Sequence, residues 1–281
     1  MERITMSRFS WDNEWRLQNL KEESFLVRHV MDKTPKWVCL VEKKVPESLQ
    51  NTLETAFNKA FVTVFENAAV VIEKTYAKEK QIKQYNVNQR RLNEDGFHGR
   101  NVRKFEKEAK KTVLKNVAIS SVEGIGFGLV GWGIPDIPIF VSVLLKSIYE
   151  IAISYGFSYQ SDKEKFFILK IIDTALKSGE VLRQKDEELN SLIEKYDNEE
   201  KYPNQYGATD PFVLELQIAR QIDYSALSLS HELLYGKFVQ GTTIVGVIGG
   251  TADITCLKKI TEYASLKYKR RFLLRQMPEE D

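Results

Sequence analysis

Two aspartates, Asp136 and Asp253, occupy the positions that most directly suggest chemistry. Each follows a glycine-rich apolar segment and precedes an apolar segment with helical spacing. A carboxylate at such a position caps a helix, because it accepts backbone N–H bonds and meets the positive end of the helix dipole. Alternatively, the two carboxylates approach each other across an internal pseudo-repeat and bind a cation or share a proton. Glu123, beside the first glycine-rich segment, is a third candidate acid.

Familiar catalytic and metal-binding motifs are absent from the sequence. His231 and Glu232 begin like the helix of a zinc protease, but Tyr235 stands where the second histidine ligand is required. There is no Gly-x-Ser-x-Gly nucleophile elbow, and neither cysteine has a histidine close to it in sequence. We therefore assign no catalytic, metal-binding or cofactor-binding residue, and we favour a non-enzymatic protein over an uncharacterised hydrolase.

The glycine-rich apolar segments at residues 122–133 and 241–250 lack the pattern of a nucleotide-binding loop. In the first segment no Lys-Ser/Thr pair follows the glycines and no strand precedes them. One interpretation is close helix packing, because glycines three or four residues apart let backbones approach each other. The other is a membrane-dipping hairpin, with Gly131 and Gly133 leading into Pro135 and Pro138. These prolines should break the apolar run 124–145 into two arms of about half a membrane span each.

Hydrophobic periodicity indicates that these segments belong to an all-α protein. Apolar residues with helical spacing predict helices over 47–76, from about 101, and over 139–155, 161–177, 210–235 and 253–275. We expect one domain, residues 1–281, folded as a multi-helix bundle around the two glycine-rich segments. A broken helical hairpin is expected near Pro135–Pro138, and polar loops are expected near 80–101 and 197–210.

Several local signals mark the ends of these helices. Ser161 and Glu164 have the spacing of a capping box. Asp210 followed by proline suits a helix start, because the aspartate caps the helix and the proline fits its first turn. Gly156 and Gly236 are suited to end the helices that precede them.

Composition indicates a globular protein without a strong overall charge. The 41 basic and 39 acidic side chains leave a net charge of +2, which argues against a dedicated nucleic-acid-binding protein. The two cysteines, Cys39 and Cys256, form no CxxC pair, so a reducing, cytoplasmic setting is favoured. The polar N-terminus does not have the pattern expected of a signal peptide. The sequence contains no run of 18 uncharged apolar residues, so we predict no conventional membrane-spanning helix.

The charges are distributed unevenly along the chain. Residues 78–115 contain twelve basic and five acidic side chains, whereas residues 180–200 contain three basic and eight acidic ones. The basic stretch leads directly into the apolar segment at 124–145, and such a combination is attracted to an anionic bilayer surface. A solvated face is the alternative. The candidate contacts to an anionic surface are Arg100, Arg103, Lys104, Lys107, Lys110 and Lys111.

From about residue 11 to residue 275 the sequence resembles the EcsC family. The most specific part is Pro135-Asp136-Ile137-Pro138, followed one helix later by Tyr155-Gly156-Phe157, with further similarity at 44–47, 131–134 and 237–253. The resemblance implies a bacterial cytoplasmic protein from a family named for a gene cluster that also encodes an ABC transporter. It carries over no established catalytic residue.

The leading expectation is therefore a non-enzymatic accessory protein that is cytoplasmic and peripheral at the inner face of the cell membrane. Its partner would be the anionic membrane surface or a membrane protein such as an ABC transporter. The second expectation is a helical protein that holds a lipid or another hydrophobic ligand in an internal cavity, suggested by Phe127, Trp132, Phe140 and Tyr149. An uncharacterised hydrolase is the third, and no cofactor is expected.

Overall fold

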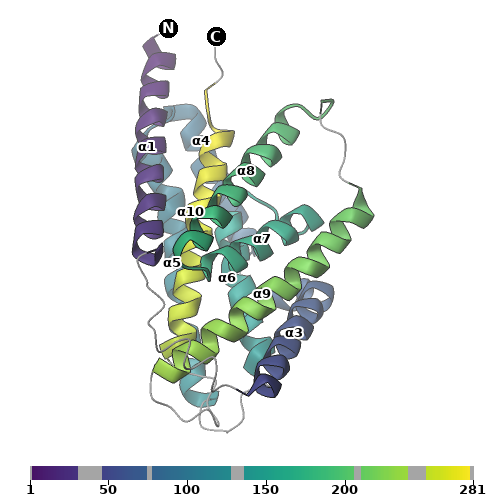
Figure 1. The fold of residues 1–281 in the computed structure, drawn as a ribbon. Helices are drawn as coiled ribbons and strands as arrows, with labels where there is room; N and C mark the ends of the chain where they lie inside the picture. Colours follow the sequence, from purple (N-terminus) through teal and green to yellow (C-terminus); the bar gives the residue numbers. More distant parts are fainter. Residues whose placement is uncertain are drawn as a thin grey trace.

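The computed structural model describes residues 2–30, 46–74, 78–127, 136–205, 210–239 and 251–278, and within these ranges the chain is helical, with short connections and no strand. The helices, labelled in Figure 1, are α1 (Glu2–Val30), α3 (Glu47–Lys74), α4 (Lys78–Asp95), α5 (Gly99–Phe127), α6 (Asp136–Ser154), α7 (Asp162–Ala175), α8 (Gly179–Lys201), α9 (Pro211–Val239) and α10 (Thr251–Arg275). The all-α multi-helix bundle expected from the sequence is confirmed.

Helix α10 runs through the middle of the bundle. It contacts α1, α5, α6, α7, α8 and α9, and its side chains Tyr263, Tyr268 and Phe272 are buried among them. Helix α1 lies along one side of α10 and α3 lies on the side of the molecule away from α1, whereas α9 runs diagonally from that side to below α10 (Figure 1). The first and the last helix of the chain are therefore packed against each other.

Helix α6 is the most apolar of the described helices. Among the residues that the structure describes, its stretch Ile137–Ser154 is long and apolar enough to cross a membrane, by length and composition only. Two thirds of this stretch is buried, and α6 contacts α3, α4, α5 and α10. A core helix meets the same criteria as a spanning one, and α6 occupies a core position in this bundle.

Three of the predicted helix-end signals are present in the structure. The N–H of Glu164 donates to Oγ of Ser161 at 3.3 Å, and the N–H of Phe212 donates to Oδ1 of Asp210 at 2.9 Å. Gly156 follows the end of α6 with a φ of +82°, in the left-handed region that favours glycine. A Cβ at this glycine would lie 2.2 Å from Cζ of Tyr85, so the turn also needs glycine for space.

Other predicted boundaries are wrong. The loop expected near 80–101 is largely helix α4, and residues 96–98 alone connect it to α5. Its asparagines weaken an isolated helix, but Asn88 and Leu92 are buried, and Gln81 donates to Glu150 of α6 at 3.0 Å. The loop expected near 197–210 begins later, because α8 continues to Lys201, and α9 continues through Gly236 to Val239. Helix α1 is not among the predicted helices.

Candidate anion-binding groove and buried charge network

Most of the residues singled out around the glycine-rich segments lie outside the described part of the structure. These are Gly131, Gly133 and Pro135, together with the side chains of Glu123, Asp136 and Asp253. The backbone places Asp136 at the first position of α6 and Asp253 at the third position of α10. Pro138 is exposed in the first turn of α6. Helix capping by the two aspartates, and their alternative role in cation binding or proton sharing, stay predictions.

All six cations expected to contact an anionic surface lie on α5. These are Arg100, Arg103, Lys104, Lys107, Lys110 and Lys111. Five are exposed, and the half-buried Lys104 donates to Oδ1 of Asn101 at 3.1 Å. Arg103, Lys107 and Lys111 are four residues apart, so they form one row on the surface of the helix. We call these three residues the α5 row.

The α5 row borders a groove between α1 and α5. The groove has a volume of about 800 Å³ and is lined by Glu14, Leu17 and Lys21 of α1 and by Arg103, Glu106, Lys107, Lys110 and Lys111 of α5. Five cations and two carboxylates line it, which leaves an excess of three positive charges. A groove of this charge attracts anions.

Glu106 forms ion pairs with some of the cations that line this groove. Its carboxylate forms ion pairs with three lysines: Lys21 at 2.7 Å, Lys110 at 2.9 Å and the buried Lys269 of α10 at 3.2 Å. Burial alone would raise the pKa of Glu106, but the hydrogen bonds from Lys21 and Lys110 and the charge of Lys269 outweigh it and lower the pKa from 4.5 to about 2. Glu106 is therefore ionised at neutral pH, and its single negative charge offsets part of the charge of the three lysines that it contacts.

The α5 row keeps its charge available. Among the described residues, Lys107 and Lys111 form no ion pair with a carboxylate. The Nε of Arg103 donates to the carbonyl of Gly99 at 3.2 Å, which leaves its positive charge without a paired carboxylate in the described structure. The groove thus combines cations held by Glu106 with cations that have no carboxylate partner in the described part of the chain.

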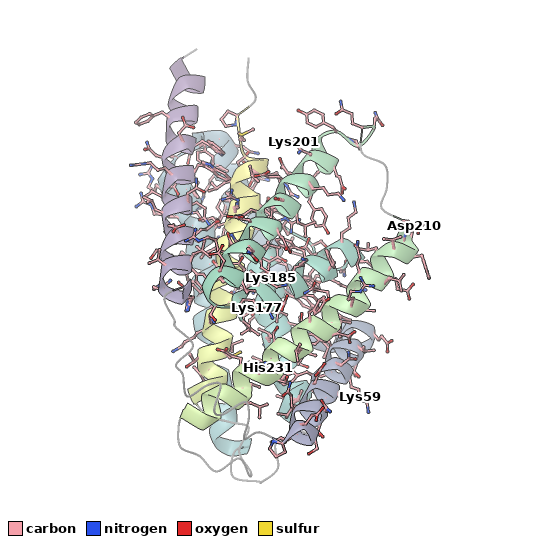
Figure 2. All side chains as sticks on the ribbon, viewed as in Figure 1. Lys59, Lys177, Lys185, Lys201, Asp210 and His231 are labelled. Carbon is pink, nitrogen blue, oxygen red and sulfur yellow. The ribbon has the colours of Figure 1, made fainter. Side chains whose placement is uncertain are left out.

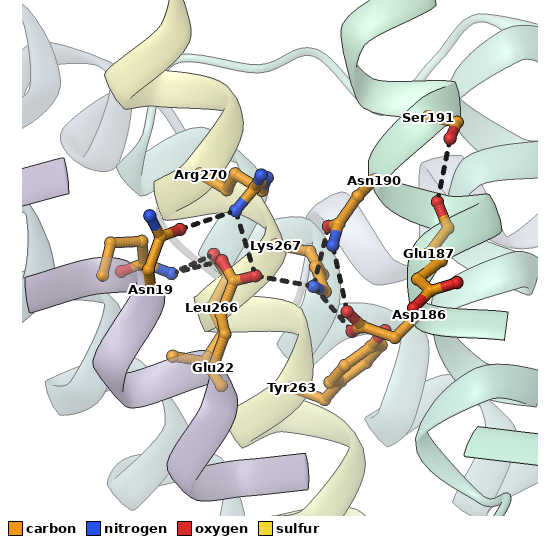
Figure 3. Close-up of polar contacts among 11 residues, drawn as sticks. Asn19, Glu22, Asp186, Glu187, Asn190, Ser191, Tyr263, Leu266, Lys267 and Arg270 are labelled. Atoms are coloured by element: carbon orange, nitrogen blue, oxygen red, sulfur yellow. Dashed lines mark hydrogen bonds and ion pairs between the residues drawn. The ribbon is translucent and has the colours of Figure 1, made fainter. Parts of the chain in front are cut away.

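The cations of α10 have a different environment, which Figure 3 shows around Lys267. The Lys267 side chain is fully buried, and its Nζ lies 2.7 Å from Asp186 of α8 and 2.9 Å from Glu22 of α1. It also donates to Oδ1 of Asn190 at 2.9 Å, and the hydroxyl of Tyr263 donates to Asp186 at 2.6 Å. Burial, and then the charge of Asp186, raises the pKa of Tyr263 well above its usual value, so Tyr263 stays a neutral donor.

Lys269 and Arg271 of α10 are also paired inside the bundle. Lys269 lies 3.4 Å from Glu14 and 3.2 Å from Glu106, so it connects α10 to both walls of the groove. Arg271 donates to both carboxylate oxygens of Glu164, at 2.8 and 3.0 Å, and its guanidinium lies over the rings of Phe157 and Phe167. Five residues form what we call the α1–α10 charge network: Glu14 and Glu22 of α1, and Lys267, Lys269 and Arg270 of α10.

A further charge cluster joins α7, α8 and α9. Fully buried Asp173 binds Lys177 at 2.9 Å and Lys185 at 2.8 Å, both labelled in Figure 2, and accepts a hydrogen bond from Ser228 at 2.7 Å. Burial opposes ionisation of Asp173, but the hydrogen bond from Lys185 and the charge of Lys177 outweigh it and lower the pKa of the carboxyl. Each charge in this cluster has a partner, so we interpret it as structural.

Histidine, cysteine and acidic side chains do not gather in the described part of the chain. There, no group of three such residues is placed to hold a metal ion. His231 is exposed and its Nε2 lies 2.7 Å from Nε2 of Gln50, while Cys256 is buried. The hydrolase interpretation needs Glu123, Asp136 or Asp253, whose side chains are not described, and it stays untested.

The aromatic residues suggested for an internal ligand cavity are packed against other rings where they are described. Phe140 meets Phe57 edge to face at 6.3 Å, and Tyr149 stacks on Tyr159 at 4.0 Å between centroids. The second groove, about 540 Å³, lies on the surface of α3 beside Pro138. The described contacts therefore do not favour a cavity at Phe140 or Tyr149.

The contribution of α1 to the groove and to the charge network was not predicted from the sequence. Glu14, Gln18 and Glu22 are four residues apart and buried, so they form one polar row that faces α10. A helix in which the buried row is polar has no apolar stripe, and hydrophobic periodicity does not detect it. The spacing of Glu14 and Glu22 was the feature of the sequence that could have indicated this buried polar row.

Comparisons with known proteins match nearly the whole chain. The family model described as the EcsC protein family matches residues 13–273. Protein EcsC of Bacillus subtilis (strain 168) is 22% identical over 262 residues, which cover 92% of each chain. The uncharacterized protein YdbA of the same organism is 27% identical over 150 residues, 52% of this chain and 49% of that protein. No solved structure gives a significant match. The chain belongs to the EcsC protein family.

Proposed function

We propose that this chain is a non-enzymatic accessory protein that associates peripherally with an anionic membrane surface through the groove between α1 and α5. The observation that carries the proposal is the α5 row, in which Arg103, Lys107 and Lys111 line one groove without a carboxylate partner among the described residues. A well-placed Lys or Arg near an anionic bilayer contributes ~1 kcal/mol, so three of them give a useful but reversible attraction.

Exposed apolar side chains on α1 also favour the proposed contact with a membrane surface. Leu17 lines the groove, and Leu20 lies beside Lys21, with 43% and 58% of these leucine side chains exposed. Phe9 and Val27 are also exposed on α1, and with a helical rotation of 100° per residue they fall on the same side as Leu20. Basic residues next to exposed apolar ones are the combination that binds at the interface of a bilayer.

The proposed location is the cytoplasmic face of the cell membrane, where anionic lipids produce the negative surface potential. Association with a membrane protein such as an ABC transporter is the finer form of the proposal, and the resemblance to the EcsC family motivates it. In that form the α5 row holds the chain at the bilayer while another surface contacts the transporter.

Co-sedimentation with vesicles tests the proposal. The wild-type chain should bind phosphatidylglycerol vesicles and not phosphatidylcholine vesicles, and added salt should weaken binding because exposed charges are screened. Lys107→Glu/Lys111→Glu should reduce binding to phosphatidylglycerol by about 30-fold or more, since each cation contributes ~1 kcal/mol. Equal binding by this variant and the wild type would place the contact elsewhere.

A matched control carries the same charge change on the other side of the molecule. Lys59→Glu/Arg220→Glu alters two exposed cations, one on α3 and one in the first third of α9, the part of that helix far from α1. Lys59 is labelled in Figure 2. This variant should bind phosphatidylglycerol vesicles nearly as well as the wild type does. If both double variants lose binding equally, net charge and not the groove explains the attraction.

A further inference from the structure

We infer that α10 carries a second anion-binding surface, formed by Lys267, Lys269 and Arg270, which α1 covers in this structure with its own carboxylates. An anionic lipid surface that engages the groove displaces Glu14 and Glu22 and opens α1 away from α10. The identity of this occupant rests on the proposed function, whereas the covering of α10 by α1 rests on the contacts of the charge network.

The carboxylates of α1 occupy the cationic surface as ligands within the same chain. Glu14 lies 3.4 Å from Lys269, and Glu22 lies 2.9 Å from Lys267 and 3.3 Å from Arg270. Between them, Nε2 of Gln18 donates to the carbonyl of Leu266 at 2.9 Å. Figure 3 shows Glu22 between Lys267 and Arg270. Phosphate oxygens make the same charge-assisted contacts with Lys and Arg that these carboxylates make.

The covered surface is continuous with the groove. Glu14 and Glu106 both line the groove, and both are partners of the buried Lys269. An anion that enters between α1 and α5 therefore meets Lys269 as soon as Glu14 moves aside. Lys267 and Arg270 follow along α10, where Glu22 is the shared carboxylate. One anionic surface can thus contact the α5 row first and the α10 cations afterwards.

The contacts that hold α1 are of a kind that an anionic surface can replace. Buried ion pairs add little net stability, because their attraction is offset by the cost of removing both charges from water. When α1 leaves, Glu14 and Glu22 regain that hydration, whereas an apolar interface of equal size would lose its stabilisation outright. The buried apolar side chains Trp11, Phe25 and Leu26 of α1 oppose the opening and make it reversible.

The bundle left behind keeps partners for its buried cations. Without α1, Lys267 still binds Asp186 and Asn190, and Lys269 still binds Glu106. Neither ammonium is left alone in an apolar setting, which would be the main penalty of breaking a buried pair. Each also loses one carboxylate partner, so each gains capacity for an external anion. The open state is therefore compatible with an intact bundle.

A distance measurement between α1 and α8 tests the opening. Spin labels at Asp12→Cys and Glu187→Cys occupy exposed positions on the two helices, in a chain with Cys39→Ser and Cys256→Ala. Electron–electron distance measurements should give one short distance in buffer and with phosphatidylcholine vesicles. Bound to phosphatidylglycerol vesicles, the protein should show a second, longer distance. A single unchanged distance in the vesicle-bound protein would overturn the inference.

Two variants sharpen the result. Glu22→Gln weakens the cover and should increase the longer-distance population, while Lys267 keeps Asp186. Glu14→Met/Lys269→Met replaces a buried pair by packed apolar side chains and should abolish that population, and Glu106 keeps Lys21 and Lys110. The control Arg28→Met/Glu262→Met removes an exposed α1–α10 ion pair and should behave like the labelled wild type. Opening in the Glu14→Met/Lys269→Met variant equal to that of the wild type would contradict the inference.

The outcome separates this inference from the proposed function. If the labelled chain fails to bind phosphatidylglycerol vesicles at all, the proposed function fails and the assigned occupant fails with it. If the chain binds and α1 stays closed, the proposed function stands and the covered surface does not exist as a binding site. If the chain binds and α1 opens, both hold.

Discussion

The cations of α5 and the cations of α10 lie on two helices in contact, yet they use their charge in different ways. Lys107 and Lys111 of α5 are exposed and have no carboxylate partner among the described residues. Lys267 and Lys269 of α10 are buried and bind carboxylates from α1, α5 and α8. Residue type is therefore not what decides between a structural and a binding role. In the structure with α1 in place, the decisive variable is whether the neighbouring helices supply an acid, and the α10 cations become available to an external anion only when α1 withdraws Glu14 and Glu22.

The difference also shows why buried charge is the more sensitive of the two. An exposed cation that loses its partner is solvated by water, so its removal changes little. A buried carboxylate that loses its cation stays in a low dielectric without compensation. Substitutions of the buried α10 cations should therefore mainly lower stability, whereas substitutions in the α5 row should mainly lower binding.

Lys267→Met should have the largest effect on stability. It leaves Glu22 with Arg270 as its cation and Gln18 as a neutral donor, and it leaves Asp186 with only neutral donors, although both carboxylates remain buried. Breaking a buried ion pair on one side costs about 3–5 kcal/mol of unfolding free energy. Urea denaturation of Lys267→Met beside Lys107→Met measures the contrast. A loss below about 1 kcal/mol would mean that water or other groups compensate the two acids.

Arg271→Lys should have the next largest effect although it keeps the charge. Both contacts to Glu164 come from one nitrogen, Nη1, so a lysine ammonium can replace them in part, but it cannot reproduce the planar guanidinium that lies over Phe157 and Phe167. We expect a loss of about 2 kcal/mol, the size of a cation–π contact shielded from water. Arg220→Lys on exposed α9 is the control, and its thermal melting temperature should match that of the wild type. Equal melting of both variants would show that charge alone matters at Arg271.

Glu106 should make stability depend on pH. Its pKa in the folded chain is lowered from 4.5 to about 2, so the folded state favours the ionised form. Its contribution is therefore fully present above about pH 4.5 and is lost as the pH falls towards about 2. After a discount for solvent screening we expect about 1–2 kcal/mol. The stability difference between the wild type and Glu106→Gln should shrink over this range in urea titrations. A difference that stays constant with pH would rule out the assigned ion pairs.

Lys107→Ala/Lys111→Ala should have the smallest effect on stability and a clear effect on binding. Each side chain is exposed, so the unfolding free energy should stay within about 0.5 kcal/mol of the wild-type value. Binding to phosphatidylglycerol vesicles should fall about fivefold per lysine, which is the factor for ~1 kcal/mol. If stability falls and vesicle binding does not, the contrast between the α5 row and α10 is reversed.

The sequence predicted the helical class and several helix ends because those depend on local patterns. The capping box at Ser161 and the turn at Gly156 need only neighbouring residues, and both are present. Helix α4 was missed because its support comes from other helices, such as the contact between Gln81 and Glu150 of α6. Local composition carries no information about such support.

The site was predicted in part for the same reason. The cations of α5 were proposed as anion contacts from their density in the sequence; the structure places them on one helix, and their role stays a prediction. The groove needs Glu14 and Lys21 from α1, which lie about 90 residues before α5's Glu106 and Lys110. The burial of the α10 cations could not be predicted, because nothing near them in sequence shows that Glu14, Glu22 and Glu164 are their partners. Partners from distant segments are settled only by the fold.

The pairing of the first helix with the last one sets an order for synthesis. Trp11 donates to the carbonyl of Leu273 across 262 positions, and Lys269 binds Glu14 across 255 positions. At about 5–20 residues per second, α1 leaves the ribosome roughly 10–50 s before the residues that bury it exist. During that interval its tryptophans and acids have no native partner on α10, and nascent-chain chaperones can reach them. The contacts between α1 and α10 can form only after α10 has been synthesised.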